Sequence, residues 1–286
     1  MPSTASSEMH AIPVHRLYRN GSQVPHSMTT APSAYSSPRE SYGRSPATAH
    51  RQKPNSNSPV IISLQNVSKL YGNNGKALDN VNWQIRKGDF WFVTGPSGAG
   101  KSTLLKLLYG EEKCSQGDLV VNNCTPSRLR HRQMSMLRRQ IGVVFQDYKL
   151  IPRRTVSENV AFVLWAQGFT RKEIHRRLMP TLKMVGLQDK ADRFPHELSG
   201  GEQQRVSIAR AIVGTPPILL ADEPTGNLDS HNSWQVIKIL KKLNGVGITV
   251  IVTTHDEQLV KLSDHPVVQI RNGRLHRMQD WELGRS

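Results

Sequence analysis

The residues that decide the fold are Gly95-Pro96-Ser97-Gly98-Ala99-Gly100-Lys101-Ser102. They fit the pattern G-x-x-x-x-G-K-S/T, whose glycines let the backbone curl until successive N–H groups point at phosphate oxygens. The apolar run 90–94 before the loop indicates a buried strand, and the spacing of apolar residues over 101–109 indicates a helix. Such a helix presents the positive end of its dipole to the same anion. The sequence therefore predicts a phosphate-binding loop, and the strand and helix around it make a mere glycine-rich turn the weaker interpretation.

A second apolar run, 218–221, ends in the two carboxylates Asp222 and Glu223. Parallel strands place such residues at the edge of the sheet where ligands bind. Lys101 can reach the β- and γ-phosphates of a nucleotide, and Ser102 can ligate Mg²⁺. Asp222 is suited to hold the same ion, and Glu223 is suited to polarise an attacking water. Two acids after a strand could instead cap a helix or form a solvated turn, but the phosphate-binding loop makes that interpretation weaker.

The segment Leu198–Arg205 combines a helix start with a double glycine. Ser199 and Glu202 fit a capping box, which explains the serine and the glutamate but not the glycines. Gly200 and Gly201 allow a close backbone approach and so predict a second anion site at a helix start. Because the chain has two such helix starts but one phosphate-binding loop, we expect two identical chains to pair head to tail, each completing the other's site.

Short apolar runs and segments of helical spacing predict an α/β protein in which helices cover a parallel sheet. Strand patterns cover 60–67, 81–85, 90–94, 141–145, 218–221 and 248–253, and helical periodicity covers 101–109, 155–167, 170–185, 199–213 and 233–243. The stretch from about 125 to 213 interrupts the alternation of strands and helices. It therefore predicts an inserted helical subdomain.

The first 58 residues differ from the rest in composition. Residues 1–58 contain 12 Ser and 7 Pro, with six basic against two acidic residues. Such a segment buries too little apolar surface to offset chain entropy, so we expect a disordered basic extension over 1–58 and a folded domain over 59–286. The net charge of the whole chain is +16, and +12 of it belongs to 59–286. This excess favours a polyanion such as nucleic acid, nucleotide phosphates or an anionic lipid surface, although a solvated basic surface would explain it equally well.

Cysteines and apolar runs exclude several other classes of protein. The only two cysteines, Cys114 and Cys124, cannot form a disulfide scaffold. The apolar runs stop far short of the roughly 20 residues that a membrane-spanning helix needs. The first 30 residues contain no apolar stretch typical of a secretory signal. We therefore expect a chain that acts at a membrane only through a separate membrane protein.

These motifs together resemble the ATP-binding cassette (ABC) family over residues 60–286. Residues 95–102 and 222–223 match its two Walker motifs, and 198–204 match its signature. The resemblance implies a P-loop NTPase fold with a RecA-like parallel-sheet core, an N-terminal antiparallel β-subdomain and an inserted α-helical subdomain. It also implies ATP and Mg²⁺ as ligands and a homodimer in the ATP-bound state.

Four single residues match further motifs of the family. Gln146 matches the glutamine that touches Mg²⁺ and senses a transmembrane partner, and Asp229 matches the D-loop. His255 matches the switch histidine that contacts the γ-phosphate, and Tyr71 matches the aromatic residue that stacks on adenine. Taken singly, Gln146 could be a surface polar residue, His255 a helix cap or a core histidine, and Tyr71 a packed aromatic. Their order and spacing favour the family interpretation.

The resemblance thus predicts three sets of site residues. The catalytic set is Glu223, His255 and Lys101, and the Mg²⁺ set is Ser102, Gln146 and Asp222. The nucleotide set is Tyr71, Gly95, Pro96, Ser97, Gly98, Ala99, Gly100, Lys101, Ser102, Thr103, Gln146, Ser199, Gly200, Gly201 and Asp229.

Within the family, the sequence is most similar to the cell-division ATPases of the FtsE type. Residues 138–147, 154–156, 158–160 and 194–197 carry this similarity. It implies an FtsX-like transmembrane partner, a peripheral position on the cytoplasmic face of the bacterial plasma membrane, and control of peptidoglycan hydrolysis. The ATPases of lipoprotein-release and macrolide-export transporters share the motifs at 201–205 and 221–229, so an ATPase subunit of that type is the alternative.

Overall fold

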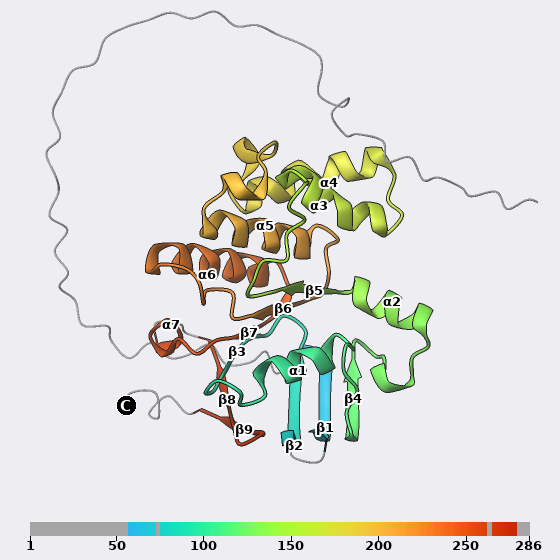
Figure 1. Cartoon of the computed structure of the whole chain (residues 1–286). Coiled ribbons are helices and arrows are strands. Elements are labelled where there is room, and N and C mark those ends of the chain that lie inside the picture. The colour runs from blue at the N-terminus through green and yellow to red at the C-terminus, as the bar shows by residue number, and fades with distance from the viewer. Residues whose placement is uncertain (1–56, 73–74, 262–264, 279–286) are drawn as a thin grey trace, which may run out of the picture. The chain divides into compact units, whose positions relative to one another are not determined.

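The structure, a computed structural model, describes residues 57–72, 75–261 and 265–278 (Figure 1). All but the last two residues of the predicted extension over 1–58 lie outside the described residues. Within the described residues the strands are β1 (Val60–Tyr71), β2 (Gly75–Arg86), β3 (Phe90–Thr94), β4 (Gln116–Val121), β5 (Ile141–Val144), β6 (Ile218–Asp222), β7 (Thr249–Thr253), β8 (Val267–Arg271) and β9 (Arg274–Arg277). The α-helices are α1 (Lys101–Leu108), α2 (His131–Arg139), α3 (Val156–Ala166), α4 (Arg171–Met184), α5 (Gly200–Ile212), α6 (Ser230–Gly245) and α7 (Glu257–Lys261).

The strands form two sheets. One has three antiparallel strands in the order β2-β1-β4, and the other has six strands in the order β5-β6-β7-β3-β8-β9. Pairing is parallel from β5 through β8, and β9 runs antiparallel to β8. The chain is therefore an α/β protein with a mostly parallel sheet and a separate antiparallel sheet, as the sequence predicted.

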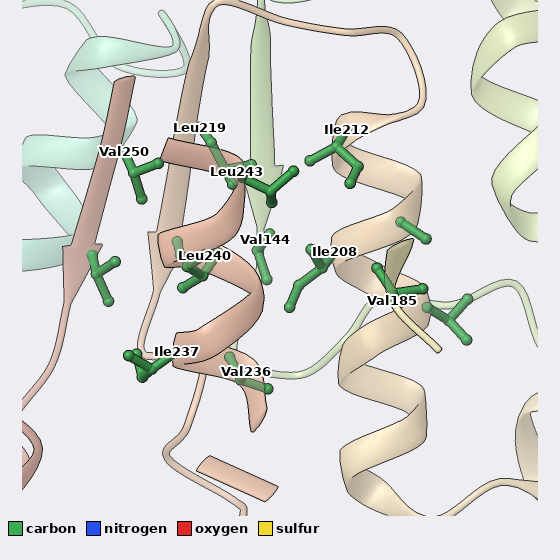
Figure 2. Packing of buried hydrophobic residues seen from close by; sticks show 14 of the residues in the cluster. Val144, Val185, Ile208, Ile212, Leu219, Val236, Ile237, Leu240, Leu243 and Val250 are labelled. Atoms are coloured by element: carbon green, nitrogen blue, oxygen red, sulfur yellow. The ribbon is translucent and has the colours of Figure 1, made fainter. Parts of the chain in front are cut away.

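Side-chain alternation in the buried strands divides the apolar residues into two cores. In β3, Phe90 and Phe92 pack with the helices α3 to α6, whereas Trp91 and Val93 pack with α1 and the antiparallel sheet. Figure 2 shows the first core, in which Leu219 and Val250 of the sheet lie beside residues of α5 and α6. Since successive strand residues point to opposite faces, an all-apolar strand requires such cover on both sides.

Capping boxes begin three of the helices that the sequence predicted. Thr155, Thr170 and Ser199 are the N-caps of α3, α4 and α5, and each accepts a hydrogen bond from the backbone N–H of a glutamate three residues later. Each glutamate in turn accepts from the backbone N–H of its cap, so two helix-end donors are satisfied at each start. These local sequences fix where the helices begin.

Several elements were not expected from the sequence. β4, β8, β9, α2 and α7 are additional, and β1 and β2 extend beyond the predicted 60–67 and 81–85. β5 lies inside the stretch 125–213 yet pairs with β6 in the six-stranded sheet. The bounds of a helical subdomain therefore remain a prediction. Across the described residues, the helices are too short or too polar to cross a bilayer.

Candidate active site

The loop between β3 and α1 requires glycine at two positions. Gly95 has φ 146° and Gly100 has φ 109°, values that side-chain-bearing residues rarely adopt. A Cβ atom at Gly95 would collide with the carbonyl oxygen of Ile270, and one at Gly100 would collide with that of Ala77. The glycines thus allow the loop to lie directly against β8 and β2, and α1 begins at the end of this tight turn.

Lys101 is the buried cation of this loop, with 5% of its side chain exposed. Its Nζ donates hydrogen bonds to the carbonyl oxygens of Gly95 (2.9 Å) and Pro96 (3.1 Å). The same atom lies 3.3 Å from Oε1 of Glu223, which follows β6. The ammonium group therefore lies between the phosphate-binding loop and the Glu223 carboxylate at the end of β6.

Glu223 joins this cation to a histidine. Its Oε2 lies 2.9 Å from Nδ1 of His255, and the His255 side chain is 61% exposed whereas that of Glu223 is 17% exposed. The backbone of Glu223 has φ 44°, a left-handed conformation that is uncommon for a residue with a side chain. Its N–H donates to the carbonyl oxygen and to the hydroxyl of Thr253. These two bonds hold the strained residue in place.

Thr253 is a site residue to which sequence reasoning gave no role. Its hydroxyl donates a 2.6 Å hydrogen bond to Oδ1 of Asp222, in addition to accepting from the N–H of Glu223. Asp222 and Thr253 are register partners at the ends of the parallel strands β6 and β7. The sequence contained a signal for this placement, because Thr253 ends one apolar strand as Asp222 ends another. The ends of parallel strands meet at the same edge of a sheet.

The predicted Mg²⁺ ligands offer the oxygen atoms that this ion prefers. Asp222 carries a carboxylate, Ser102 an exposed hydroxyl in the first turn of α1, and Gln146 an exposed amide. Mg²⁺ is typically bound through one or two carboxylates together with water and substrate phosphates. Because Thr253 binds only one oxygen of Asp222, the other oxygen is available to an ion, and the donor set fits Mg²⁺.

The signature segment lies at the start of α5 and contacts α6. Gly201 is so close to Asn232 of α6 that an added Cβ would collide with the Asn232 side chain, and Gly200 lies near the hydroxyl of Tyr148. Ser199 is exposed, and its hydroxyl accepts from the N–H of Glu202. Sequence reasoning missed Asn232, whose polar side chain on a solvent-facing part of α6 carried no distinctive pattern.

The other three predicted residues lie at the start of α6, in the loop after β5 and at the end of β1. Asp229 is the N-cap of α6, and its carboxylate accepts from the backbone N–H and the side-chain amide of Asn232, which lowers the pKa of Asp229 below its ordinary value. Gln146 lies beside Gly226, in the loop that follows Glu223. Tyr71 ends β1 with 42% of its surface exposed, and Nζ of Lys69 lies 4.8 Å from its ring centroid.

The structure thus brings part of the predicted site together within one chain. Glu223 contacts both Lys101 and His255, and Asp222 is linked to Glu223 through Thr253. Among the described residues, no hydrogen bond or ion pair links Ser199 or Tyr71 to this cluster. A cation, two carboxylates and an imidazole at a phosphate-binding loop can bind a polyphosphate and orient a water molecule.

Comparison with known proteins gives a consistent result. The sequence model described as "ABC transporter" matches residues 78–226. The chain is 47% identical over 217 residues to "Cell division ATP-binding protein FtsE" of Streptococcus pneumoniae (strain D39), covering 76% of this chain and 94% of the relative. It is 46% identical over 216 residues to the protein of the same name from Escherichia coli K12, covering 76% and 97%.

Solved structures also resemble this chain. The dimeric post-hydrolysis structure of the ATP-binding cassette MJ0796 bound to ADP and Pi has a TM-score of 0.70 and 37% sequence identity, covering 77% of this chain and 99% of that one. The cbiO1 structure from Clostridium perfringens, part of the ABC transporter complex cbiONQ, has a TM-score of 0.73 at 30% identity and covers 79% and 90%.

Proposed function

This chain belongs to the ABC transporter family, and on that premise we propose that it is the ATP-hydrolysing subunit of an FtsE-like cell-division complex. The observation that carries the proposal is the contact of Glu223 with both Lys101 and His255 at the phosphate-binding loop. The cell-division role rests on relatives that carry that name and match this chain over nearly their whole length.

ATP would bind with its phosphates along the loop 95–102, where backbone N–H groups and the N-terminus of α1 favour negative charge. The Lys101 ammonium would exchange its carbonyl partners for β- and γ-phosphate oxygens, because a charge-assisted bond is the stronger one. Tyr71 would stack on the adenine ring. Mg²⁺, held by Ser102, Asp222 and Gln146, would neutralise phosphate charge.

Glu223 and His255 would then position one water molecule. The water oxygen attacks the γ-phosphorus, the bond from that phosphorus to the bridging oxygen breaks, and ADP departs with the electron pair. Glu223 takes the proton that the attacking water loses, so the products are ADP and inorganic phosphate. His255 would contact the γ-phosphate while its Nδ1 holds Glu223 at 2.9 Å. The tight backbone hydrogen bonds to Thr253 keep Glu223 oriented for this task.

We further propose that two chains share each active site. Ser199, Gly200 and Gly201 of one chain would cover the γ-phosphate bound to the loop of the other, with Asp229 at the junction. The exposed position of Ser199, away from the cluster of its own chain, supports such sharing. Loss of the γ-phosphate would then remove the group that joins the two chains and let the dimer reopen.

The opening and closing of the dimer would change the conformation of an FtsX-like transmembrane protein. We place the contact near Gln146 and the helices α3 and α4, on the cytoplasmic face of the bacterial plasma membrane, and the result would be control of peptidoglycan hydrolysis. Co-purification with such a membrane protein would support this role. Co-purification with a lipoprotein-extraction or export partner would overturn it.

Complementation between two inactive variants tests the shared site. Lys101→Ala removes the loop cation, and Ser199→Asp keeps a good helix cap but places a carboxylate against the γ-phosphate. Each variant alone should be inactive, whereas a mixed dimer contains one site with neither change, so an equimolar mixture should recover about a quarter of wild-type turnover. Ser199→Thr, which keeps the hydroxyl, is the matched control. Full activity of Ser199→Asp alone would contradict the shared site.

A further inference from the structure

Lys69 is a mostly buried cation beside the residue that is proposed to stack on adenine. Its side chain is 12% exposed, although lysine side chains usually lie in solvent. Lys69 and Tyr71 are two residues apart in β1, a spacing at which side chains share one face of a strand. The Lys69 ammonium lies over the Tyr71 ring, with Nζ 4.8 Å from the ring centroid. This distance is within the range of a cation–π contact.

The loop between α1 and β4 fixes the position of this ammonium. Nζ of Lys69 forms a 2.7 Å ion pair with Oε2 of Glu112 and donates a 3.0 Å hydrogen bond to the carbonyl oxygen of Lys113. An ammonium has three N–H donors, so these two bonds leave one N–H for the aromatic face. The cation is thus held in place by groups other than the ring that it contacts.

Glu112 contacts both members of the pair. Hydrogen bonding from Lys69, and to a smaller extent from the Tyr71 hydroxyl, holds the pKa of the Glu112 carboxyl below its ordinary value. One carboxylate is therefore linked to the ammonium over the ring face and to the hydroxyl at the ring edge. We call Lys69, Tyr71 and Glu112 the ring clamp, because together these contacts restrain the ring at two points.

The end of β1 is attached to the same loop by bonds outside the ring clamp. The N–H of Ser115 donates to the carbonyl oxygen of Ser68 at 2.8 Å, and the N–H of Leu70 donates to the Ser115 hydroxyl at 3.1 Å. These bonds use the backbone of β1 and do not depend on the Lys69 side chain. Loss of the ammonium should therefore leave the strand in place and release only the Tyr71 ring.

We propose that Lys69 is a positioning residue that holds the Tyr71 ring ready for the adenine base. This inference rests on the proposed stacking of adenine on Tyr71. That residue is 42% exposed, and across the described residues no second ring or cation stacks on it, so the face away from Lys69 is available to a base. A ring that is already restrained loses less freedom when the base binds. The cation also draws the electron density of the ring toward itself, which lowers the repulsion between the two aromatic faces.

The opposite role would be competition, in which the ammonium occupies the ring face that adenine needs. The contacts favour positioning, because the bonds to Glu112 and Lys113 keep the ammonium at its face of the ring whether or not a base is bound. Removal of the ammonium should weaken ATP binding if Lys69 positions the ring, and should strengthen it if Lys69 competes with the base.

Binding of ATP and of inorganic triphosphate to the full chain, measured by titration calorimetry with Mg²⁺, tests the proposal. Lys69→Met should weaken ATP binding about three- to tenfold and leave triphosphate binding unchanged, because triphosphate has no base to stack. Its KM for ATP should rise while kcat at saturating ATP stays at the wild-type value. Lys69→Arg keeps a cation that can lie over the ring and should restore ATP binding.

Tyr71→Leu separates a failure of this inference from a failure of the proposed adenine site. Tyr71→Leu should weaken ATP binding about tenfold or more without changing triphosphate binding. Adding Lys69→Met to it should cause no further loss, because the ammonium then has no ring to position. Unchanged ATP binding in Tyr71→Leu would show that the adenine site itself is wrong, and this inference with it.

Lys242→Met is the matched control, because it removes one positive charge at an exposed position of α6 and should bind both ligands as the wild type does. If Tyr71→Leu bound ATP weakly but Lys69→Met bound it as tightly as the wild type or more tightly, the positioning role alone would be overturned. Equal losses of ATP and triphosphate binding in Lys69→Met, or a further loss in the double variant, would overturn it too, since either result indicates an effect of charge or folding.

Discussion

The side-chain amide of Gln204 donates a 2.8 Å hydrogen bond to the carbonyl oxygen of Pro224. Gln204 is fully buried in α5, and Pro224 directly follows Glu223, so this bond ties the signature helix to the loop that carries the predicted base. The Oε1 atom of Gln204 is buried and has no hydrogen-bond partner among the described residues. A buried amide with one unsatisfied atom lowers the stability of the folded protein. We therefore expect substitutions at Gln204 to change the free energy of unfolding.

Gln204→Met should therefore lower the free energy of unfolding by about 1–3 kcal/mol, because it leaves the Pro224 carbonyl buried without a donor. Urea unfolding measures the change. Gln203→Met on the same helix removes a partly exposed bond to the Leu198 carbonyl and should cost less. If Gln204→Met lowered the free energy of unfolding no more than Gln203→Met, the hydrogen bond from Gln204 to Pro224 would contribute little to stability.

Lys101→Ala should weaken ATP binding about 10- to 100-fold, since a charge-assisted contact with phosphate is worth about 1.5–3 kcal/mol. Titration calorimetry with ATP measures this loss. Lys106→Ala is the matched control, because Lys106 lies on the same helix but pairs with the exposed Glu111. Unchanged affinity in Lys101→Ala would mean that the phosphate-binding loop has been assigned wrongly.

Glu223→Gln should reduce ATP turnover about 100-fold or more, the range expected when a general base is removed. ATP binding should persist, because the amide still accepts a hydrogen bond from Lys101. Since ATP is then not hydrolysed, the ATP-bound dimer should accumulate and be visible by size-exclusion chromatography. Asp118→Asn, which alters an exposed ion pair between β4 and Arg128, should leave turnover near that of the wild type. Normal hydrolysis by Glu223→Gln would rule out its role.

Asp229→Ala should lower the thermal unfolding temperature at neutral pH, because it removes the side chain that caps α6. Hydrogen bonds from Asn232 lower the pKa of Asp229 in the folded state from its usual value of 3.8. A lowered pKa means that this stabilisation is complete above pH 3.8 and is lost as the pH falls through the folded-state value. Thermal unfolding of both proteins between pH 7 and pH 3 should show the difference shrinking in acid; a constant difference would contradict this origin.

Local chemistry made the core of the fold predictable from the sequence. The glycine loop, the all-apolar strands around Phe92 and Leu220, and the capping boxes at Thr155 and Ser199 each depend on neighbours in the chain. The predicted site residues themselves remain to be tested by the variants above. Their proximity in the cluster around Glu223 follows from parallel strands ending at one edge.

Elements stabilised by distant contacts were not predictable. Leu137 is the only buried residue of α2, and Met134 and Met136 are the only other apolar ones, so the apolar stripe is too narrow to reveal the helix. The extended ends of β1 and β2 are held by pairing with each other, with register shifts that break the alternation. The sequence places Thr253 at the end of an apolar strand, but its hydrogen bond to Asp222 depends on the register of β6 with β7, which no local pattern encodes.

Asn232 contacts two parts of the molecule that the sequence separates. Its side chain fills the space left by the missing Cβ of Gly201, and its N–H and amide both bind Asp229. The first turn of α5 and the carboxylate that caps α6 therefore depend on the same side chain. A change at position 232 would alter the packing of both at once.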